Sequence, residues 1–206
     1  MTSAAEDDGR VRCAWIDPAR LAPADYVLYR DYHDTEWGRP LRDSAALFER
    51  ISLEAFQSGL SWLIILRKRD NFRRAFHRFD AARIAGYTDR DVERLMADTG
   101  IVRNRAKIEA TIANARAVVD LSEAGVDLAE LLWSFAPAER ARPIDIAHVP
   151  AVTPESTAMA KELKRRGFRF VGPTTAYALM QATGMVDDHT ADCWVPATAP
   201  GPPPRP

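Results

Sequence analysis

Two cysteines and two histidines, placed near opposite ends of the sequence, form a set that could bind a metal ion. Thiolates and imidazoles are the usual ligands of structural zinc. If their segment is helical, the four-residue spacing of His189 and Cys193 places both side chains on one face. Cys13 and His33 would complete a tetrahedral Cys2His2 site that joins the two ends of the chain. The alternative is that the only two cysteines are small buried residues, since this long separation matches no short zinc motif.

Glu54 is a second candidate for chemistry. It follows Ile51 by three residues and Leu47 by seven, on the apolar face of an expected helix. A carboxylate buried there needs a hydrogen-bond donor, a bound ligand or a raised pKa. Glu54 therefore either makes a structural hydrogen bond or faces a ligand.

Aromatic residues lie in short polar segments near these candidates. Such residues usually pack in a core, but they can also stack on a flat heterocycle whose hydrogen-bonding edge is read by a carboxylate. A carboxylate favours a base that is cationic or rich in donors. The residues concerned are Trp15, Tyr32, Trp37 and Trp62.

Composition indicates a soluble globular protein. The 206 residues are 47% hydrophobic and 28% charged, and no apolar run approaches the roughly 18 residues of a membrane span. The acidic start lacks the pattern of a secretory signal, which predicts a cytoplasmic location with reduced thiols. The net charge of -1 does not by itself indicate nucleic-acid binding. Basic residues do cluster at 67–74, 103–107 and 161–169, either as solvated helix faces or as phosphate contacts.

Hydrophobic periodicity predicts an all-α protein with one main domain at 11–195. We expect a flexible start at 1–10 and a disordered proline-rich tail at 196–206. Capping and stop signals refine the helix ends. The predicted helices cover 43–57, 61–79, 88–99, 104–124, 127–135 and 154–166, a connecting loop covers 141–154, and a last helix begins near Pro173.

The turn between the last two helices, GFRFVG, is typical of a helix-hairpin-helix motif. Backbone N–H groups at the start of the second helix would suit a phosphate oxygen. Lys164, Arg166 and Arg169 flank this turn. The alternative is an ordinary helical hairpin that ends on a glycine cap.

Several segments together resemble the 3-methyladenine DNA glycosylase I family, from about Cys13 to Trp194. They are RCAW, YHDTEWGRP, LEAFQSGLSWLIILRKR, GIVRNRAKIEATIANARA, LLWSF, LKRRGFRFVGPTTAYALMQATG and DDHTADCW. The resemblance implies an all-helical fold of the helix-hairpin-helix glycosylase superfamily. It also implies structural Zn²⁺ held by Cys13, His33, His189 and Cys193.

The same resemblance assigns roles to single residues. Glu54 would read a flipped methylated base, Tyr32 would hydrogen-bond to it and Trp62 would stack on it. Trp15 and Trp37 would complete the walls of the pocket. Gly59 and Leu60 would approach the DNA where the base leaves the stack, and the hairpin would hold a backbone phosphate. The DNA-binding residues so implied are Gly59, Leu60, Lys164, Arg166, Gly167, Gly172 and Thr174.

One position departs from the family pattern. The family often has asparagine before the Asp-His pair of the zinc segment, where this chain has Asp187. Other helix-hairpin-helix glycosylases carry a catalytic aspartate at what looks like the corresponding point. Asp187 is therefore either catalytic or a residue that orients the neighbouring metal ligand, and the orienting role is favoured.

The function implied is excision of 3-methyladenine from alkylated double-stranded DNA by a monomeric, monofunctional glycosylase without a membrane partner. A closed four-ligand zinc site has no open position for water, which makes zinc structural. Two alternatives stay open. One is a non-catalytic zinc-stabilised DNA-binding module, which leaves Glu54 unexplained, and the other is a hydrolase that uses zinc at an open position.

Overall fold

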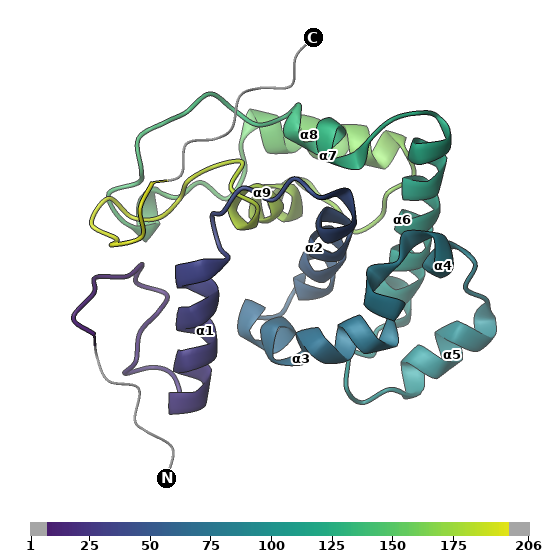
Figure 1. Ribbon diagram of the computed structural model, residues 1–206, viewed down its shortest axis with the longest axis horizontal. Coiled ribbons are helices and arrows are strands. Elements are labelled where there is room, and N and C mark those ends of the chain that lie inside the picture. Colours follow the sequence, from purple (N-terminus) through teal and green to yellow (C-terminus); the bar gives the residue numbers. More distant parts are fainter. Residues whose placement is uncertain (1–7, 198–206) are drawn as a thin grey trace.

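The protein is built from helices in the computed structural model, which describes residues 8–197. No strand occurs within that range. Figure 1 shows the helices in sequence order. They are α1 (Pro23–Thr35), α2 (Ser44–Gln57), α3 (Trp62–Ala75), α4 (Ala81–Ala85), α5 (Asp89–Ala97), α6 (Arg105–Glu123), α7 (Leu128–Trp133), α8 (Pro154–Arg165) and α9 (Pro173–Ala182), with 3₁₀ turns at His77–Phe79 and Ile146–His148.

Most predicted helices are confirmed, and side-chain caps define several of their starts. Asp43 accepts a hydrogen bond from the Ala46 N–H at the start of α2. Thr153 forms a capping box with Ser156 ahead of Pro154, as its sequence position indicated. The predicted loop at 141–154 is irregular apart from one 3₁₀ turn. Such caps satisfy N–H groups that have no partner inside the helix.

Two helices were missed and one was predicted too long. α1 was missed because it buries Tyr26, Tyr32 and His33 rather than a row of aliphatic side chains. α4 has only five residues, too few to show a period. The predicted helix 61–79 ends at Ala75, because the chain turns through positive φ angles at His77–Phe79.

The core forms around α2, which packs against α3, α6, α7 and α9. Phe48, Phe56, Phe72 and Phe76 are fully buried there, and the Phe56 and Phe72 rings lie 4.7 Å apart between centroids. Each buried aromatic side chain contributes roughly 2–3 kcal/mol of transfer free energy. This aromatic centre fixes the end of α2, where Glu54 lies.

The two terminal segments meet beside α1 (Figure 1). The Trp194 N–H donates to the Val11 carbonyl at 2.9 Å. Arg12 forms a two-pronged ion pair with Asp34 of α1, at 2.8 Å for the closer oxygen. Residues 1–7 of the predicted flexible start and 198–206 of the predicted disordered tail lie outside the described residues.

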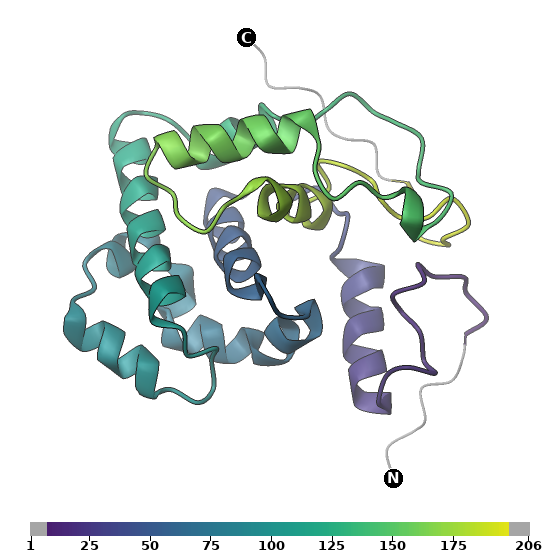
Figure 2. The same cartoon turned by 180° about the vertical axis from the view of Figure 1, so that it is seen from behind.

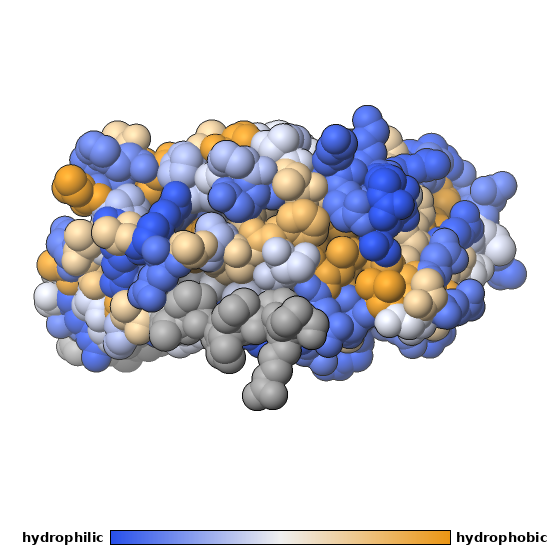
Figure 3. Space-filling model, turned by 90° about the horizontal axis from the view of Figure 1, so that it is seen from above, coloured by the Kyte–Doolittle hydropathy of each residue, from blue (hydrophilic) through white to orange (hydrophobic). Residues whose placement is uncertain are grey.

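The helices α8 and α9 pack against each other as a hairpin, seen from behind in Figure 2. The surface viewed from above, in Figure 3, is mostly hydrophilic with scattered apolar residues. None of the described helices is both long and apolar enough to cross a membrane.

Candidate functional site

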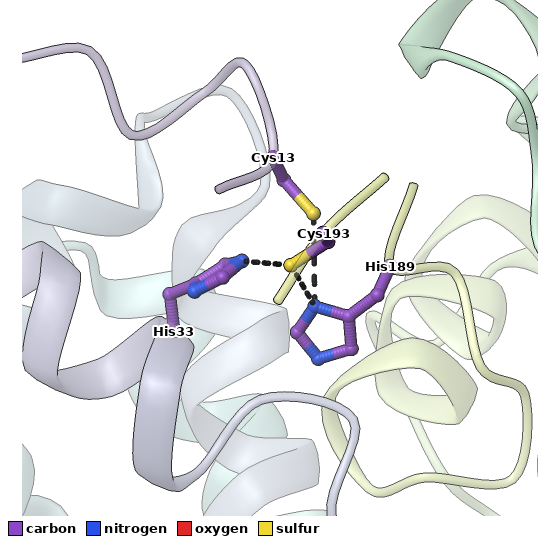
Figure 4. A group of neighbouring side chains, drawn as sticks. All are labelled: Cys13, His33, His189 and Cys193. Carbon is purple, nitrogen blue, oxygen red and sulfur yellow. Dashed lines mark hydrogen bonds between the residues drawn. The ribbon is translucent and has the colours of Figure 1, made fainter. Parts of the chain in front are cut away.

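The predicted metal ligands converge at the junction of the termini. Cys13 comes from the amino-terminal segment, His33 from α1, and His189 and Cys193 from the carboxy-terminal segment (Figure 4). Their ligand atoms all lie within 4.8 Å of one another. All four side chains are buried. The chain thus brings together residues that are 176 positions apart.

The spacing of these atoms fits a central cation. The Cys193 Sγ lies 3.6 Å from the His33 Nε2 and 3.5 Å from the His189 Nδ1, and the Cys13 Sγ lies 3.6 Å from the same Nδ1. Tetrahedral zinc with Zn–S near 2.3 Å and Zn–N near 2.05 Å places sulfur and nitrogen about 3.5 Å apart. The quartet therefore has the dimensions of a four-coordinate Cys2His2 site.

Both imidazoles are oriented by partners outside the cluster. The Nδ1 of His33 lies 2.7 Å from an Asp34 carboxylate oxygen, and the Nε2 of His189 lies 3.2 Å from the Trp37 carbonyl. If each of these nitrogens donates its proton, the other nitrogen of each ring is free to bind a metal. Such partners fix the tautomer of a metal-binding histidine.

The electrostatics of the two thiols also favour a cation. The hydrogen bond with Cys193, together with burial, raises the pKa of Cys13. The same contact lowers the pKa of Cys193. Two adjacent thiolates repel each other unless a positive charge lies between them. Residues 189–193 are not helical, so the condition under which His189 and Cys193 would share a helical face is not met, and turns and bends bring the two side chains together instead.

A cavity of about 120 Å³ opens next to this cluster. Aromatic and amide side chains from the amino-terminal segment and from α1, α2, α3 and α9 surround one carboxylate. The lining residues are Trp15, Tyr29, Tyr32, Trp37, Glu54, Gln57, Trp62, Ala178, Gln181 and Ala182. All five predicted base-binding residues therefore line one cavity.

Within residues 8–197, Glu54 is the only acid lining this cavity, and it is 4% exposed. Among the described residues, none donates a hydrogen bond to its carboxylate. Burial raises the pKa of Glu54 to about 7, although the Arg50 guanidinium offsets part of that rise. A buried carboxylate without a donor is suited to bind a donor or a positive charge on a ligand.

Arg50 organises the groups around Glu54. Its guanidinium donates to the Tyr32 hydroxyl at 2.9 Å and lies 5.2 Å from the centroid of the Trp62 ring. Because the Tyr32 oxygen accepts from Arg50, its own proton remains for another acceptor. The Trp62 indole N–H is buried and has no hydrogen-bond partner in the part of the chain that the structure describes. The cavity thus combines aromatic faces with an acceptor and unused donors.

Trp15 and Trp37 connect the cavity to the metal-ligand cluster. The Trp15 ring lies 5.1 Å from the His33 ring and 5.2 Å from the Trp37 ring, between centroids. Trp37 packs edge-on against His189, with the ring centroids 4.7 Å apart. Two walls of the cavity are therefore backed by the cluster, so order at the termini determines the shape of the cavity.

Sequence reasoning missed three polar residues that line the cavity. Tyr29 precedes Tyr32 by three residues on α1, a spacing that could have indicated it. Gln57 follows Glu54 by the same interval on α2. Gln181 lies on α9, and its amide donates to Asp188 at 2.9 Å. No local pattern links α9 to this cavity.

Asp187 does not line the cavity that holds Glu54. Its carboxylate pairs with Arg142 at 2.8 Å and accepts a hydrogen bond from the backbone N–H of His189 at 3.2 Å. It borders a separate cavity of about 210 Å³, which shares no lining residue with the one that holds Glu54. This placement favours an orienting role for Asp187 over a catalytic one.

The predicted DNA-binding residues lie in two exposed turns. Gly59, at φ +80°, and Leu60, at 38% exposure, connect α2 to α3 beside the cavity. Gly167, at φ +92°, ends α8, and Gly172 precedes α9 with open space next to its Cα. Thr174 is also exposed there. Both turns therefore present their backbone to solvent.

The basic clusters differ in how much charge remains available. Arg67 and Arg69 are paired with Asp25 and Glu36. In the third cluster Arg166 is paired with Glu162, whereas Lys164 is exposed and forms no ion pair among the described residues. Lys68 and Arg74 of α3 form no ion pair within residues 8–197 either, but each is hydrogen-bonded to a neutral group.

Comparison with known proteins decides the family. The methyladenine glycosylase family matches residues 23–196. The chain belongs to the methyladenine glycosylase family. It is 44% identical over 187 residues to the DNA-3-methyladenine glycosylase of Haemophilus influenzae, covering 88% of this chain and 96% of that protein.

Solved structures agree with this family assignment. The crystal structure of a 3-methyladenine DNA glycosylase I superposes with a TM-score of 0.84 at 46% identity, covering 89% of this chain and 98% of the other. A variant of such an enzyme, solved in complex with 3-methyladenine, gives a TM-score of 0.81 at 33% identity, covering 90% and 98%. This methyladenine glycosylase therefore has the all-helical fold of those enzymes, and it is a hydrolase of N-glycosyl bonds.

Proposed function

We propose that the protein excises 3-methyladenine from alkylated double-stranded DNA by hydrolysing the N-glycosidic bond. The observation that carries the proposal is the buried carboxylate of Glu54, which faces an aromatic cavity without a protein donor. A relative 44% identical over most of its length is named DNA-3-methyladenine glycosylase. A structural neighbour was solved with 3-methyladenine bound.

Selectivity would come from charge and from stacking. A base methylated at N3 is cationic in the nucleoside, so ionised Glu54 would attract it and accept its N–H groups. Trp62 would stack on its face, and the hydroxyl of Tyr32, polarised by Arg50, would hydrogen-bond to it. A damaged base also costs less to unstack than an intact one.

Bond cleavage would need little further catalysis. The cationic base is already a good leaving group, so a water molecule can complete hydrolysis without a strong general acid. No lysine lines the cavity among the described residues, which supports a monofunctional enzyme without a Schiff-base intermediate. We propose that the enzyme acts as a monomer.

The cysteine and histidine cluster would hold Zn²⁺ as a structural ion. Its four ligands are spaced for a closed tetrahedron. The ion would neutralise the two thiolates and hold the terminal segments together. Asp187 would keep the His189 backbone in place, as a positioning residue.

The two DNA-facing turns would contact different parts of the duplex. Gly59 and Leu60 would approach the duplex where the base leaves the stack. The backbone around Gly172 and Thr174, with Lys164 and Arg166 nearby, would hold a phosphate at the start of α9.

Chromatography of the bases released from methylated duplex DNA tests this function. We expect the wild type to release 3-methyladenine and Glu54→Gln to lose at least about 10-fold in rate, because the variant lacks the charge. Glu49→Gln removes a carboxylate from the same helix outside the cavity and should keep the wild-type rate.

Asp187→Asn should also release the base, because an amide oxygen can still accept the His189 N–H. A large loss with this variant would make Asp187 catalytic. DNA binding by the wild type without any base release would favour the non-catalytic binding module.

A further inference from the structure

The segment GIVRNRAKIEATIANARA covers the start and centre of α6, yet none of its residues enters the cavity or the metal-ligand cluster. Three polar residues of this helix are nevertheless buried. Lys107, Thr111 and Asn114 are 6%, 1% and 0% exposed. Buried polar side chains on one helix need partners, and those partners indicate what the helix holds in place.

Lys107 binds the end of α2. Its ammonium donates to the Phe56 carbonyl at 2.8 Å and to the Ser58 carbonyl at 2.5 Å. Carbonyls in the last turn of a helix have no partner within it and carry the negative end of its dipole. Burial lowers the pKa of Lys107, and no carboxylate compensates for that burial. The next residue along the chain is Gly59, so Lys107 fixes the turn from α2 to α3.

Asn114 binds the hairpin between α8 and α9. Its side-chain oxygen accepts from the Arg169 N–H at 2.7 Å, and its amide donates to the Arg169 carbonyl at 3.1 Å. The side-chain amide thus pairs with the N–H and the carbonyl of Arg169 as a backbone amide of a neighbouring strand would, and it holds the centre of the turn. Figure 2 shows this connection curving beside α6. Thr111 lies between the two contacts and bonds only to the Lys107 carbonyl within α6.

The two contacts lie on one face of a single rigid element. Lys107 and Asn114 are seven residues apart, about two turns or about 10 Å along a helix axis. Asn104 caps the helix one turn before Lys107. The turn beside the cavity and the phosphate-facing hairpin are therefore joined through α6 by side chains bonded directly to their backbones.

We propose that α6 is a spacer that fixes the turn at Gly59 and Leu60 relative to the hairpin, with Lys107 and Asn114 as its positioning residues. The proposal rests on the proposed function, because it assumes that both turns contact the duplex. One turn would hold a phosphate while the other meets the gap left by the flipped base. A fixed distance between the two turns would couple phosphate binding by the hairpin to extrusion of the base.

The test compares base release from duplex DNA with binding of the free base. The variants are Lys107→Met and Asn114→Leu, which keep the side-chain size and remove the hydrogen bonds. Thr111→Val is the matched control, since it removes a buried hydrogen bond from the same face without contacting either turn. Tryptophan fluorescence with free 3-methyladenine reports on the cavity alone, and circular dichroism confirms folding.

We expect both variants to bind free 3-methyladenine within about twofold of wild type. Their single-turnover release from methylated duplex should fall between about 10-fold and 100-fold, the cost of a small misplacement near a reacting centre. Lys107→Arg should restore part of the rate, because a guanidinium can also donate to the two carbonyls. Thr111→Val should release the base at the wild-type rate.

The double variant distinguishes a spacer from two independent supports. If both contacts are needed to set one distance, losing either of them already removes that constraint. The fold-loss in release rate of the double variant is then smaller than the product of the two single fold-losses. Losses that multiply would overturn the proposal. Wild-type release by the single variants, or a parallel loss of free-base binding, would also overturn it.

Failure of the proposed function has a different signature. If the wild type releases no base from methylated duplex, the glycosylase function fails. The spacer is then judged from affinity for a duplex with a tetrahydrofuran abasic site. A less than multiplicative loss of that affinity in the double variant would support it, and independent losses would refute it.

Discussion

Glu54 is held where its charge is unfavourable for folding. It is buried among aromatic side chains, and its pKa rises from 4.5 to about 7 because of that burial. Each unit of such a shift corresponds to about 1.4 kcal/mol, so ionised Glu54 lowers the free energy of unfolding by about 3 kcal/mol. A carboxylate kept at that cost is more readily explained by binding than by stability.

Replacing Glu54 with glutamine should stabilise the protein at alkaline pH. Because the folded pKa is raised, stability linked to this group is complete below pH 4.5 and is lost as the pH rises through 7. The unfolding free energy of Glu54→Gln relative to wild type should therefore increase by about 1 kcal/mol between pH 6 and pH 8.5. Urea denaturation at both pH values measures it, and Glu49→Gln, which loses an ion pair to Arg73, should show no such gain. A pH-independent difference would place the pKa of Glu54 outside this range.

At this scale the sequence predicted the groups with unusual chemistry. The cysteines are few, and Glu54 interrupts an apolar face, so both were visible without a structure. The groups that orient them were not. Asp34 contacts the His33 ring, but nothing distinguishes it in the sequence from other acidic residues. Trp37 contacts His189 through its backbone carbonyl, which every residue type has, so its identity could not indicate this role.

At the scale of elements, the end of α9 packs against residues 39–41, which precede α2, and this packing requires the two backbones to lie very close together. Gly184 follows α9 with φ +70°, and a Cβ there would lie 2.6 Å from the Arg39 carbonyl carbon and 2.7 Å from the Pro40 nitrogen. The Leu41 N–H also donates to the Thr183 carbonyl at 3.1 Å. These contacts place α9 against the segment that carries Trp37.

Gly184→Ala should cost more stability than a substitution at a glycine of similar conformation. Gly125 ends α6 with φ +72°, but a Cβ there would meet nothing within 4 Å. We expect Gly125→Ala to cost about 1–2 kcal/mol from backbone strain alone, and Gly184→Ala about 2–5 kcal/mol because the clash adds to that strain. Midpoints of urea denaturation measure both. Equal costs would show that residues 39–40 move away without penalty.

Helices with aliphatic repeats were predictable, and those held by tertiary contacts were not. α2 and α6 show regular apolar positions and side-chain caps. The break after Ala75 depends on positive φ angles at His77–Phe79, for which no glycine gives a signal. The hairpin between α8 and α9 was visible as a turn, but its contact with Asn114 was not.

At the scale of the whole molecule, charge is distributed so that a net value of -1 hides a local excess. Arg67, Arg69 and Arg73 are each paired with a carboxylate. Lys164 and Arg169, beside the hairpin, are exposed and form no ion pair in the part of the chain described. Among residues 8–197, Lys68 and Arg74 of α3 lack a carboxylate partner too, but their side chains are held by hydrogen bonds to neutral groups. We therefore expect phosphate contacts mainly from the hairpin.

Salt dependence of duplex binding tests that distribution. Each phosphate contact adds about 0.9 to the slope of log affinity against log salt. Lys164→Ala should weaken binding and lower the slope by about 1. Arg67→Ala should leave the slope unchanged, because Asp25 already neutralises it. Equal slopes for the two variants would contradict a hairpin-centred contact.

The junction of the two termini is the longest-range feature of the fold. Cys13 and His189 are 176 residues apart, and only the final assembly brings them together. The four ligand types and their resemblance to a known set were visible in the sequence. The packing of Trp15 and Trp37 between this cluster and the cavity emerged only from the structure. The cluster is therefore expected to act on function through the shape of the cavity.

Removal of the proposed Zn²⁺ should loosen the junction before it affects the rest of the molecule. Binding free energy at such a site contributes to folding, and without a cation nothing joins the two sulfurs and two imidazoles that come from opposite ends of the chain. With a strong chelator, hydrogen exchange should increase in residues 11–16, 186–195 and α1, while α2, α6 and α8 remain protected.

Affinity for free 3-methyladenine should fall in step with that loss of protection, because Trp15 and Trp37 lose their support, and added Zn²⁺ should restore both properties. Base release that stops at once, with exchange at the junction unchanged, would instead indicate a metal with an open position that takes part in hydrolysis. The order of the two events thus separates a metal that shapes the pocket from one that acts on the substrate.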